Sequence, residues 1–433
     1  MHRVMKSIRK IVVLGANGAM GAGSGAVFAT AGFATTFLAR TREKAEAGRD
    51  RAIALTKGKL APDAFACGSY PADLPQALAD ADLVFEAVSE DLETKRTVFA
   101  RVEELRKPDA IVATVSSGLS IATICADRSA SFRKHFLGIH LFNPPTVIRG
   151  CELVPHAGTD PGVVAVVRDL LANRCGREVV ETADTPAFAG NRVGFKVLNQ
   201  VAQLAEEHGI AFMDHLVGPY TGRALPPLAT IDLVGWDVHA AIVDNLFANT
   251  HDVCHAQFAL PAYMARLIAA GTLGRKSGGG FFRREGKVTF VLDLATGDYR
   301  PLADVQPPTP AFVERMKTAI KHGDHAGAME VLCTAEDREA ALLRQILLGY
   351  ISYALGLVGE VVARPRDIDR IMGFGFAWAP PSVLVDAIGP GRTIAMLERA
   401  RLPVPLSVIQ AATHQRAMFD EPSVDRGRFF IAA

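Results

Sequence analysis

A glycine-rich turn close to the N-terminus constrains the fold of this chain more than any other feature. It follows the apolar run Ile8–Leu14, which predicts a short buried strand. It leads into a stretch of small residues, Gly21–Ala31, that predicts a closely packed helix. A strand, a turn with regularly spaced glycines and a helix together indicate the first unit of an α/β Rossmann fold.

The glycines of this turn, which reads Gly15-Ala16-Asn17-Gly18-Ala19-Met20-Gly21, are spaced as a dinucleotide requires. Gly15 allows the tight turn, Gly18 lets the backbone approach a pyrophosphate, and Gly21 lets the helix pack on the strand. The backbone at Ala19 and Met20 would face the phosphates near the helix N-terminus. The turn therefore predicts a dinucleotide-binding site rather than a glycine-rich loop without a ligand.

The residue that usually distinguishes NAD from NADP is missing. NAD enzymes place an Asp or Glu about 20 residues after the glycines, where it binds the ribose 2′-OH. Here the predicted strand Thr35–Leu38 runs into Arg40 and Arg42 without an acidic residue. Arginine pairs well with a 2′-phosphate, which favours NADP, whereas two solvated arginines beside the adenine are consistent with NAD. Both cofactors stay open, and Arg40 is a candidate cofactor-binding residue.

Further apolar segments predict a doubly wound sheet, with helical stretches such as Glu93–Lys107 between several strands. The predicted strands are Leu83–Val88, Ile111–Thr114, Phe136–His140, Glu152–Val154 and Val179–Glu181. Ligands of such sheets lie at the carboxyl ends of the strands. The polar residues expected there are Glu90, Ser117, His140 and Asn143.

His140 and Glu152 form a candidate acid–base pair. The connection between them is long enough to return antiparallel at the sheet edge. A glutamate that accepts the N–H of one ring nitrogen fixes the tautomer, which leaves the other nitrogen as a base. Such a pair is more often structural than catalytic, so its interpretation depends on the surrounding sequence.

Composition limits the class of protein. The chain has 433 residues, enough for more than one domain, and its 49% hydrophobic content argues against disorder. A net charge of +1 gives no basic excess for binding nucleic acid. The six cysteines form no CxxC pair, which favours reduced thiols over disulfides or a metal site. Because no apolar run is long enough to span a membrane, we expect a cytoplasmic protein.

Five stretches of the sequence, in order along the chain, resemble the 3-hydroxyacyl-CoA dehydrogenase family. They read EAVSEDLETK from Glu86, ATVSSGLSI from Ala113, GIHLFNPP from Gly138, DTPAFAGNR from Asp184 and LGRKSGGGFF from Leu273. The resemblance implies NAD(P)-linked interconversion of an L-3-hydroxyacyl-CoA and its 3-oxoacyl-CoA, a step of fatty-acid β-oxidation.

The resemblance also implies roles for individual residues. His140 matches the proton acceptor of the family and Glu152 matches its partner. Ser117 matches the serine that bonds the substrate oxygen, and Asn191 matches an asparagine that faces the acyl group. The chain departs from the family after the central strand, where Val115-Ser116-Ser117-Gly118 has one polar side chain fewer.

Cofactor contacts are implied in the same way. Glu90 and Lys95 match positions that touch the ribose and the nicotinamide side, and Lys276 lies in the closing glycine-rich stretch. Lys57 and Lys59 are candidates for the adenosine phosphate of CoA, although solvated lysines are the simpler interpretation.

Beyond Asn191 the pattern becomes helical, apart from a short predicted strand at Lys287–Asp293. Pro226–Gly235 recurs as Pro380–Gly389, and the long predicted helix Val193–His208 is echoed by Leu342–Val362. We therefore expect an all-α domain that is duplicated. The predicted domains are a Rossmann domain at 1–185, a first helical copy at 186–300, and a linker with a second copy at 301–433.

The resemblance bears on assembly as well. In the family, helical domains pair across a dimer, and the large multifunctional members carry both copies in one chain. This chain resembles their dehydrogenase portion without a hydratase domain. We expect the second copy to replace a dimer partner, giving a monomer, with a homodimer as the alternative. A hydratase or thiolase chain could associate; neither nucleic acid nor a membrane is expected as a partner.

Two other functions fit parts of the sequence. A different β-hydroxyacid dehydrogenase would use a lysine on the first helix after the Rossmann domain, and Lys196 lies there. A catalytically silent nucleotide-binding protein would account for the altered serine stretch and the missing ribose acid. The presence of His140, Glu152 and Asn191 in their expected contexts favours the acyl-CoA enzyme.

Overall fold

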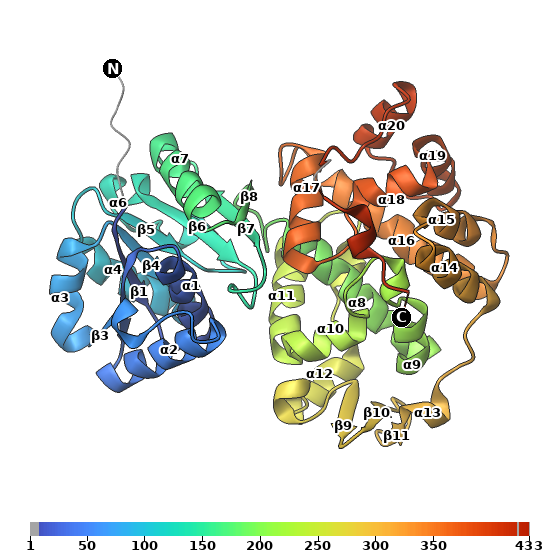
Figure 1. Cartoon of the computed structure of the whole chain (residues 1–433), viewed down its shortest axis with the longest axis horizontal. Helices are drawn as coiled ribbons and strands as arrows, with labels where there is room; N and C mark the ends of the chain where they lie inside the picture. The colour runs from blue at the N-terminus through green and yellow to red at the C-terminus, as the bar shows by residue number, and fades with distance from the viewer. Residues whose placement is uncertain (1–7, 422–423, 433) are drawn as a thin grey trace. The chain divides into compact units, whose positions relative to one another are not determined.

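The chain divides into two compact units, Met1–Phe188 and Ala189–Ala433, here called the N-terminal and the C-terminal unit (Figure 1). The computed structural model describes residues 8–421 and 424–432. Among these residues, no helix is both long and apolar enough to cross a membrane.

The N-terminal unit is built on an eight-stranded sheet in the order β3-β2-β1-β4-β5-β6-β7-β8. The strands are β1 (Lys10–Leu14), β2 (Ala34–Ala39), β3 (Phe65–Ser69), β4 (Leu83–Glu86), β5 (Ile111–Thr114), β6 (Phe136–Leu141), β7 (Gly150–Pro155) and β8 (Glu178–Glu181). The first six follow the order typical of a Rossmann fold, which confirms the predicted α/β class. The strand β3 was missed, because its sequence FACGS has one large apolar side chain and no alternation.

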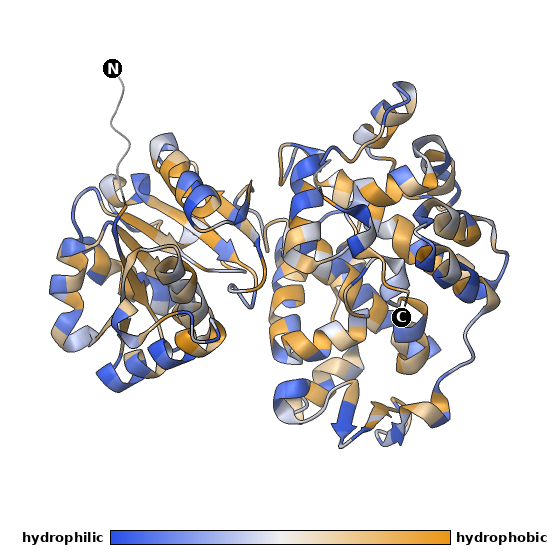
Figure 2. Cartoon of the chain, in the orientation of Figure 1, coloured by the Kyte–Doolittle hydropathy of each residue, from blue (hydrophilic) through white to orange (hydrophobic). Residues whose placement is uncertain are grey.

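Helices cover both faces of this sheet. One face packs against α1 (Ala19–Thr30), α2 (Arg42–Leu55) and α7 (Pro161–Asp169), and the other against α3 (Tyr70–Asp80), α4 (Leu92–Leu105), α5 (Ile121–Ile124) and α6 (Ala130–Lys134). Neighbouring residues of β1 pack on opposite faces of the sheet. Val13 belongs to the hydrophobic cluster on the first of these faces, and Val12 belongs to the cluster on the second. Burial on both faces explains why the central strands are continuously apolar, as their colour in Figure 2 shows.

The pair β6–β7 departs from the parallel pattern. These strands are antiparallel, and their register sets His140 opposite Glu152. Without a crossover helix, residues 142–149 form the connection between them. The predicted antiparallel return is therefore confirmed, and it places both side chains at one position of the ladder.

The C-terminal unit is mainly helical, with a small sheet in the order β11-β10-β9. Its strands are β9 (Phe282–Glu285), β10 (Val288–Leu292) and β11 (Tyr299–Pro301). Its helices are α8 (Gly190–His208), α9 (Ile210–Leu216), α10 (Pro227–Val234), α11 (Trp236–Asn249), α12 (Ala262–Ala269), α13 (Leu302–Val305), α14 (Ala311–Lys321), α15 (His325–Thr334), α16 (Arg338–Gly356), α17 (Pro365–Ile371), α18 (Pro381–Ile388), α19 (Pro390–Arg399) and α20 (Leu406–Thr413). The predicted strand at Lys287–Asp293 corresponds to β10.

Two long helices, α8 and α16, form the centre of this unit. They pack closely where Gly349 of α16 faces Lys196 of α8: a Cβ at Gly349 would lie 3.1 Å from the Lys196 Nζ. Arg192 reinforces the contact by donating hydrogen bonds to the Tyr353 hydroxyl, at 3.0 Å, and to Glu360, at 2.8 Å. The first and second halves of the C-terminal unit are therefore joined by buried polar contacts as well as by apolar packing.

Candidate active site

The glycine turn between β1 and α1 has two glycines that the fold itself requires. Gly15 has a φ of +76°, and a Cβ there would lie 2.4 Å from the carbonyl oxygen of Ala87. A Cβ at Gly21 would lie 2.3 Å from the carbonyl oxygen of Gly15. Gly18 differs, because the nearest atom to its Cβ position is 3.4 Å away. Protein packing leaves room at Gly18, so a glycine there is explained better by the approach of a ligand.

The N-terminus of α1 lies immediately after this turn. Gly18 is its N-cap residue and no side chain caps the helix. The first-turn N–H groups, at Ala19, Met20 and Gly21, are therefore left for water or an anion, and the helix dipole favours negative charge there. Together with the space at Gly18, this arrangement fits the pyrophosphate of a dinucleotide.

The two arginines after β2 differ in their surroundings. Arg42 Nη2 lies 3.6 Å from the carboxylate of Asp73 at the start of α3. Arg40 is exposed and forms no ion pair with the described residues. Of the two cations expected near the adenosine, Arg40 is thus the one available to a ribose or its phosphate.

A buried ion pair lies behind the ends of β4 and β5. Lys95 of α4 is fully buried, and its Nζ lies 2.9 Å from Glu86 Oε1 and 3.3 Å from Glu90 Oε2. Thr114 donates a 2.6 Å hydrogen bond to the other oxygen of Glu86. The carboxylates of Glu86 and Glu90 enclose the ammonium group of Lys95. The surroundings of Lys95 therefore fit an ion pair within the protein rather than the expected direct contact with the cofactor.

Glu90 organises the loop that follows β5. Its Oε1 accepts hydrogen bonds from the Ser116 hydroxyl, at 2.5 Å, and from the backbone N–H groups of Ser117 and Gly118, at 2.9 and 3.0 Å. Burial raises the pKa of Glu90, but Lys95 and these hydrogen bonds outweigh it and lower the pKa overall. The carboxylate is thus held ionised, and it fixes the backbone at Ser117 while the Ser117 hydroxyl makes no hydrogen bond to the described residues.

Asp184, between β8 and α8, holds the far end of the same loop. Its carboxylate accepts hydrogen bonds from the Ser120 hydroxyl and from the N–H groups of Ile121 and Ala122, each at 2.8 Å. This caps the N-terminus of α5. In the sequence Asp184 stands out only as part of a motif, because a carboxylate that caps a helix more than 60 residues earlier in the chain gives no local signal.

His140 and Glu152 are in contact at the end of the sheet. The His140 Nδ1 lies 2.6 Å from Glu152 Oε2; the histidine is 5% exposed and the glutamate 0%. The rings of Phe142 and Phe188 lie on His140, with centroids at 4.9 and 5.6 Å. A carboxylate at Nδ1 requires a proton on that nitrogen, which leaves Nε2 as an acceptor.

Three predicted residues belong to the C-terminal unit. Asn191 is buried in the first turn of α8. Lys196 is buried one turn further on and donates a 2.9 Å hydrogen bond to Gln200; burial lowers the pKa of Lys196. Lys276 is half-exposed and forms an ion pair with Asp237.

The arrangement in the N-terminal unit is suited to one chemistry. At the carboxyl ends of the strands, this unit combines a turn that can bind a dinucleotide with the imidazole of His140. The Nε2 of His140 can accept a proton as a hydride departs. This is the chemistry of NAD-dependent dehydrogenases.

Comparison with known proteins narrows the class. The sequence profile of the 3-hydroxyacyl-CoA dehydrogenase NAD-binding domain matches residues 10–185, and that of the C-terminal domain matches residues 188–284. A probable 3-hydroxyacyl-CoA dehydrogenase of Deinococcus radiodurans is 33% identical over 64% of this chain and 83% of its own length. The chain belongs to the 3-hydroxyacyl-CoA dehydrogenase family, and the match to its NAD-binding domain identifies NAD as the cofactor.

The likeness extends into the helical region. A probable 3-hydroxyacyl-CoA dehydrogenase of Bacillus subtilis is 30% identical over 92% of this chain, which spans about half (53%) of that relative's length. The crystal structure of a 3-hydroxybutyryl-CoA dehydrogenase from Escherichia coli K12 has a similar fold, with a TM-score of 0.69 and 22% identity over 94% of this chain and 99% of that one. A Rossmann-like sheet followed by a helical region is therefore shared along nearly the whole chain.

Proposed function

We propose that the protein oxidises the 3-hydroxyl of an L-3-hydroxyacyl-CoA to the 3-oxoacyl-CoA with NAD, in fatty-acid β-oxidation. The observation that carries this proposal is the 2.6 Å contact between His140 Nδ1 and Glu152 Oε2 at the end of β6. Family membership supports the choice of substrate.

In this proposal His140 accepts the hydroxyl proton at Nε2. NAD, which the glycine turn between β1 and α1 would hold, would supply the hydride acceptor for C3. As the C3–H and O–H bonds of the substrate break, a C=O bond forms and the imidazole of His140 becomes a cation. Glu152 stabilises that cation through Nδ1–H, and general-base assistance of this kind contributes about 10²–10⁴ in rate. The aromatic rings of Phe142 and Phe188 restrict the imidazole to one orientation.

Ser117 and Asn191 are proposed to bind the reacting oxygen. The hydroxyl of Ser117 makes no hydrogen bond to the described residues, and Glu90 holds the Ser117 backbone, which supports a pre-organised donor. Lys95 is proposed to act as a positioning residue, because it holds Glu90. Lys276 is retained as a candidate cofactor residue, although its pairing with Asp237 also fits a structural role.

The adenosine phosphate of CoA is proposed to bind near Lys57 and Lys59. These lysines line a cavity of about 430 Å³ in the N-terminal unit, together with Arg174 and Arg177. Among the described residues, four cations and no carboxylate line this cavity, which favours a phosphate. The cavity also includes Thr146, in the connection that follows the His140 strand, which brings the CoA end of a substrate toward the proposed base.

We also infer that the helical region is duplicated, with the division at 1–185, 186–300 and 301–433. Corresponding hydrogen bonds support this inference. Asp214 accepts from the N–H of Leu228 at the start of α10, and Asp369 accepts from Ser382 at the start of α18. These donors are separated by 154 residues, the offset between Pro226 and Pro380.

A second set of contacts repeats with acceptors at the same offset of 154 residues, although its donors lie 137 residues apart. Asp232, near the end of α10, accepts from the N–H groups of Phe281 and Phe282, while Asp386, in α18, accepts from Met418 and Phe419.

Because α8 and α16 pack on each other within one chain, we propose that the second copy replaces a dimer partner. Sedimentation at several concentrations tests this, and a constant monomer mass is expected.

The test of activity is oxidation of NADH by acetoacetyl-CoA, followed by absorbance. The wild-type protein should turn over, and His140→Gln should lose activity by a factor of about 10²–10⁴. The competing mechanism would use Lys196, so Lys196→Met provides the comparison. Full activity in Lys196→Met with loss in His140→Gln supports the proposal; the opposite result contradicts it.

We further propose that the enzyme acts in the cytoplasm and that a hydratase or thiolase chain could associate with it.

A further inference from the structure

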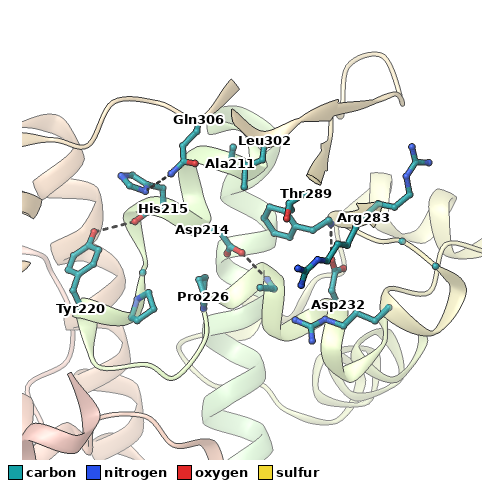
Figure 3. Close-up of a pocket in the computed structure, with 18 of the residues that line it drawn as sticks. Ala211, Asp214, His215, Tyr220, Pro226, Asp232, Arg283, Thr289, Leu302 and Gln306 are labelled. Carbon is teal, nitrogen blue, oxygen red and sulfur yellow. Dashed lines mark hydrogen bonds between the residues drawn. The ribbon is translucent and has the colours of Figure 1, made fainter. Parts of the chain in front are cut away.

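A second cavity lies within the C-terminal unit, and none of the residues proposed for catalysis is in its lining. Its volume is about 750 Å³, which is within the range of small-ligand sites. Residues of α9 and α10, the β9–β10 hairpin and α14 line it (Figure 3). His215 and Tyr220 lie at one side, Arg283 and Thr289 at the other, and Asp214 between them.

The lining of this cavity is rich in cations. The four that line it are Arg275, Arg283, Arg284 and Lys317. The lining has two carboxylates, and each is engaged by backbone N–H groups: Asp214 binds Leu228 and Ala229, and Asp232 binds Phe281 and Phe282. Burial raises the pKa of Asp214 to about 7, so its negative charge is partial at neutral pH. The lining therefore carries a net positive charge.

Three of these cations, Arg275, Arg284 and Lys317, lack a carboxylate partner among the described residues, and Arg284 donates to the backbone carbonyl of Gly286. Arg275 is near enough to Asp232 to influence its pKa but forms no ion pair with it. Lys317 lies 5.8 Å from the ring centre of Tyr220 and has no acidic partner in the part of the chain that the structure describes. Because like charges that share a cavity repel one another, the arrangement gains most when an anion enters.

Buried donors point to the same conclusion. The Nε2 of His215 and the Nε of Arg283 are buried and make no hydrogen bond to the described part of the chain. Arg283 is held in place by the ring of Tyr299, 4.3 Å from its guanidinium carbon, and by Glu285 at 2.9 Å. A buried polar atom without a partner is costly, and a ligand acceptor would satisfy it.

We propose that this cavity binds a phosphorylated ligand of nucleotide size. Arginine binds phosphate through two parallel hydrogen bonds, and four cations can neutralise two or more phosphate groups. Phe282 and Tyr220 also line the cavity and offer rings beside the charged groups, which suits a planar base. The adenosine 3′,5′-bisphosphate end of a CoA compound and a free nucleoside polyphosphate share this chemistry.

The test needs a readout specific to this cavity, since nucleotides also bind the proposed active site. Modification of Arg275 by phenylglyoxal, followed by mass spectrometry, gives one. Arg266 on α12 is exposed, lies outside the lining and serves as the internal control. The probes are adenosine 3′,5′-bisphosphate, ATP and uncharged adenosine, each titrated into the full-length protein.

Adenosine 3′,5′-bisphosphate or ATP should protect Arg275 saturably and leave Arg266 reactive, and the more potent of the two identifies the source of the ligand. In Lys317→Gln the concentration for half-protection should rise at least tenfold. In the matched variant Lys321→Gln, an exposed charge on the same helix, it should not change. Turnover of acetoacetyl-CoA should be the same in both variants. Absence of protection, equal protection by adenosine, or an unchanged midpoint in Lys317→Gln would overturn the proposal.

Discussion

Arg192 donates a 2.8 Å hydrogen bond to Glu360, a residue 168 positions further along the chain. Arg192 directly follows Asn191, the proposed substrate-binding asparagine, whereas Glu360 follows α16. Arg192 Nη2 also lies 2.9 Å from Asp252, and the Tyr353 hydroxyl donates a 2.6 Å hydrogen bond to the same carboxylate. The second half of the helical region therefore holds the first turn of α8 in place.

Tyr353→Phe tests this contact. The variant removes a hydroxyl that bridges Arg192 and Asp252, and we expect the free energy of unfolding to fall by about 1–3 kcal/mol. If the first turn of α8 positions substrate, kcat for acetoacetyl-CoA should fall as well, with no change in NADH binding. Tyr263→Phe, which loses a single hydrogen bond to a backbone carbonyl, is the control. Unchanged stability and unchanged kcat in Tyr353→Phe would contradict the assignment.

Glu152→Gln tests the role of the carboxylate beside His140. The amide keeps the size of the side chain but cannot stabilise the imidazolium by charge, so kcat should fall by about 10–10³. NADH affinity, measured by fluorescence titration, should stay the same. His135→Gln is a suitable control, because the exposed ring of His135 hydrogen-bonds the backbone carbonyl of Ser131 outside the site. Full activity in Glu152→Gln would show that Glu152 has no part in proton transfer.

Lys95→Met tests the buried ion pair. It leaves the buried carboxylate of Glu86 without its cation, and removal of one partner of such a pair costs about 3–5 kcal/mol. Arg101→Met on the same helix removes an exposed partner of Glu104 and should cost less than about 1 kcal/mol. Urea unfolding of both variants gives the comparison. Equal losses of stability would mean that the Lys95 pair is no more important than a surface pair.

Arg40→Asp tests how the adenosine ribose is recognised. A carboxylate at this position can accept hydrogen bonds from the ribose 2′-OH and repels a 2′-phosphate. We expect the ratio of kcat/KM for NADH to that for NADPH to rise at least tenfold. Arg42→Asp places the same charge beside Asp73 and should change the ratio less. A larger effect at Arg42 would assign recognition to the second arginine.

Asp369 predicts a specific dependence of stability on pH. Burial, the largest cause, raises the pKa of Asp369 to about 7. Because the folded state holds this proton more tightly than the unfolded state does, the stabilisation is complete below about pH 4 and is lost as pH rises toward 7. At about 1.4 kcal/mol per pKa unit, the rise from 3.8 to about 7 amounts to a loss on the order of 4 kcal/mol.

Asp369→Asn should reduce this dependence and leave the part that comes from Asp214, whose pKa burial also raises to about 7. Urea unfolding at pH 5 and pH 8 should show a smaller fall in stability for the variant than for the wild type. Asp304→Asn, at an exposed position, should behave like the wild type. If Asp369→Asn lost stability between these pH values as steeply as the wild type, another group would be responsible.

The parts of the fold that the sequence predicted share one property: their signals are local. The turn Gly15–Gly21 lies between an apolar strand and a helix of small residues, and the resemblance to a known family rests on contiguous stretches. The antiparallel return from His140 to Glu152 was also predictable, because a short connection without a helix leaves few alternatives. The sequence did not predict β3, because this segment has no local apolar pattern. It becomes a strand because it pairs with the free edge of β2.

The amino-acid sequence by itself determined the Rossmann class, the family and the candidate acid–base pair. Only the tertiary structure decided that Lys95 is enclosed by Glu86 and Glu90, that Asp184 caps a distant helix, and that four cations meet in one cavity. Hydrophobic periodicity and glycine spacing are properties of neighbouring residues, so they can be seen in the chain. Charge pairing and burial depend on which distant residues the packed core brings together, and the order of residues does not reveal them.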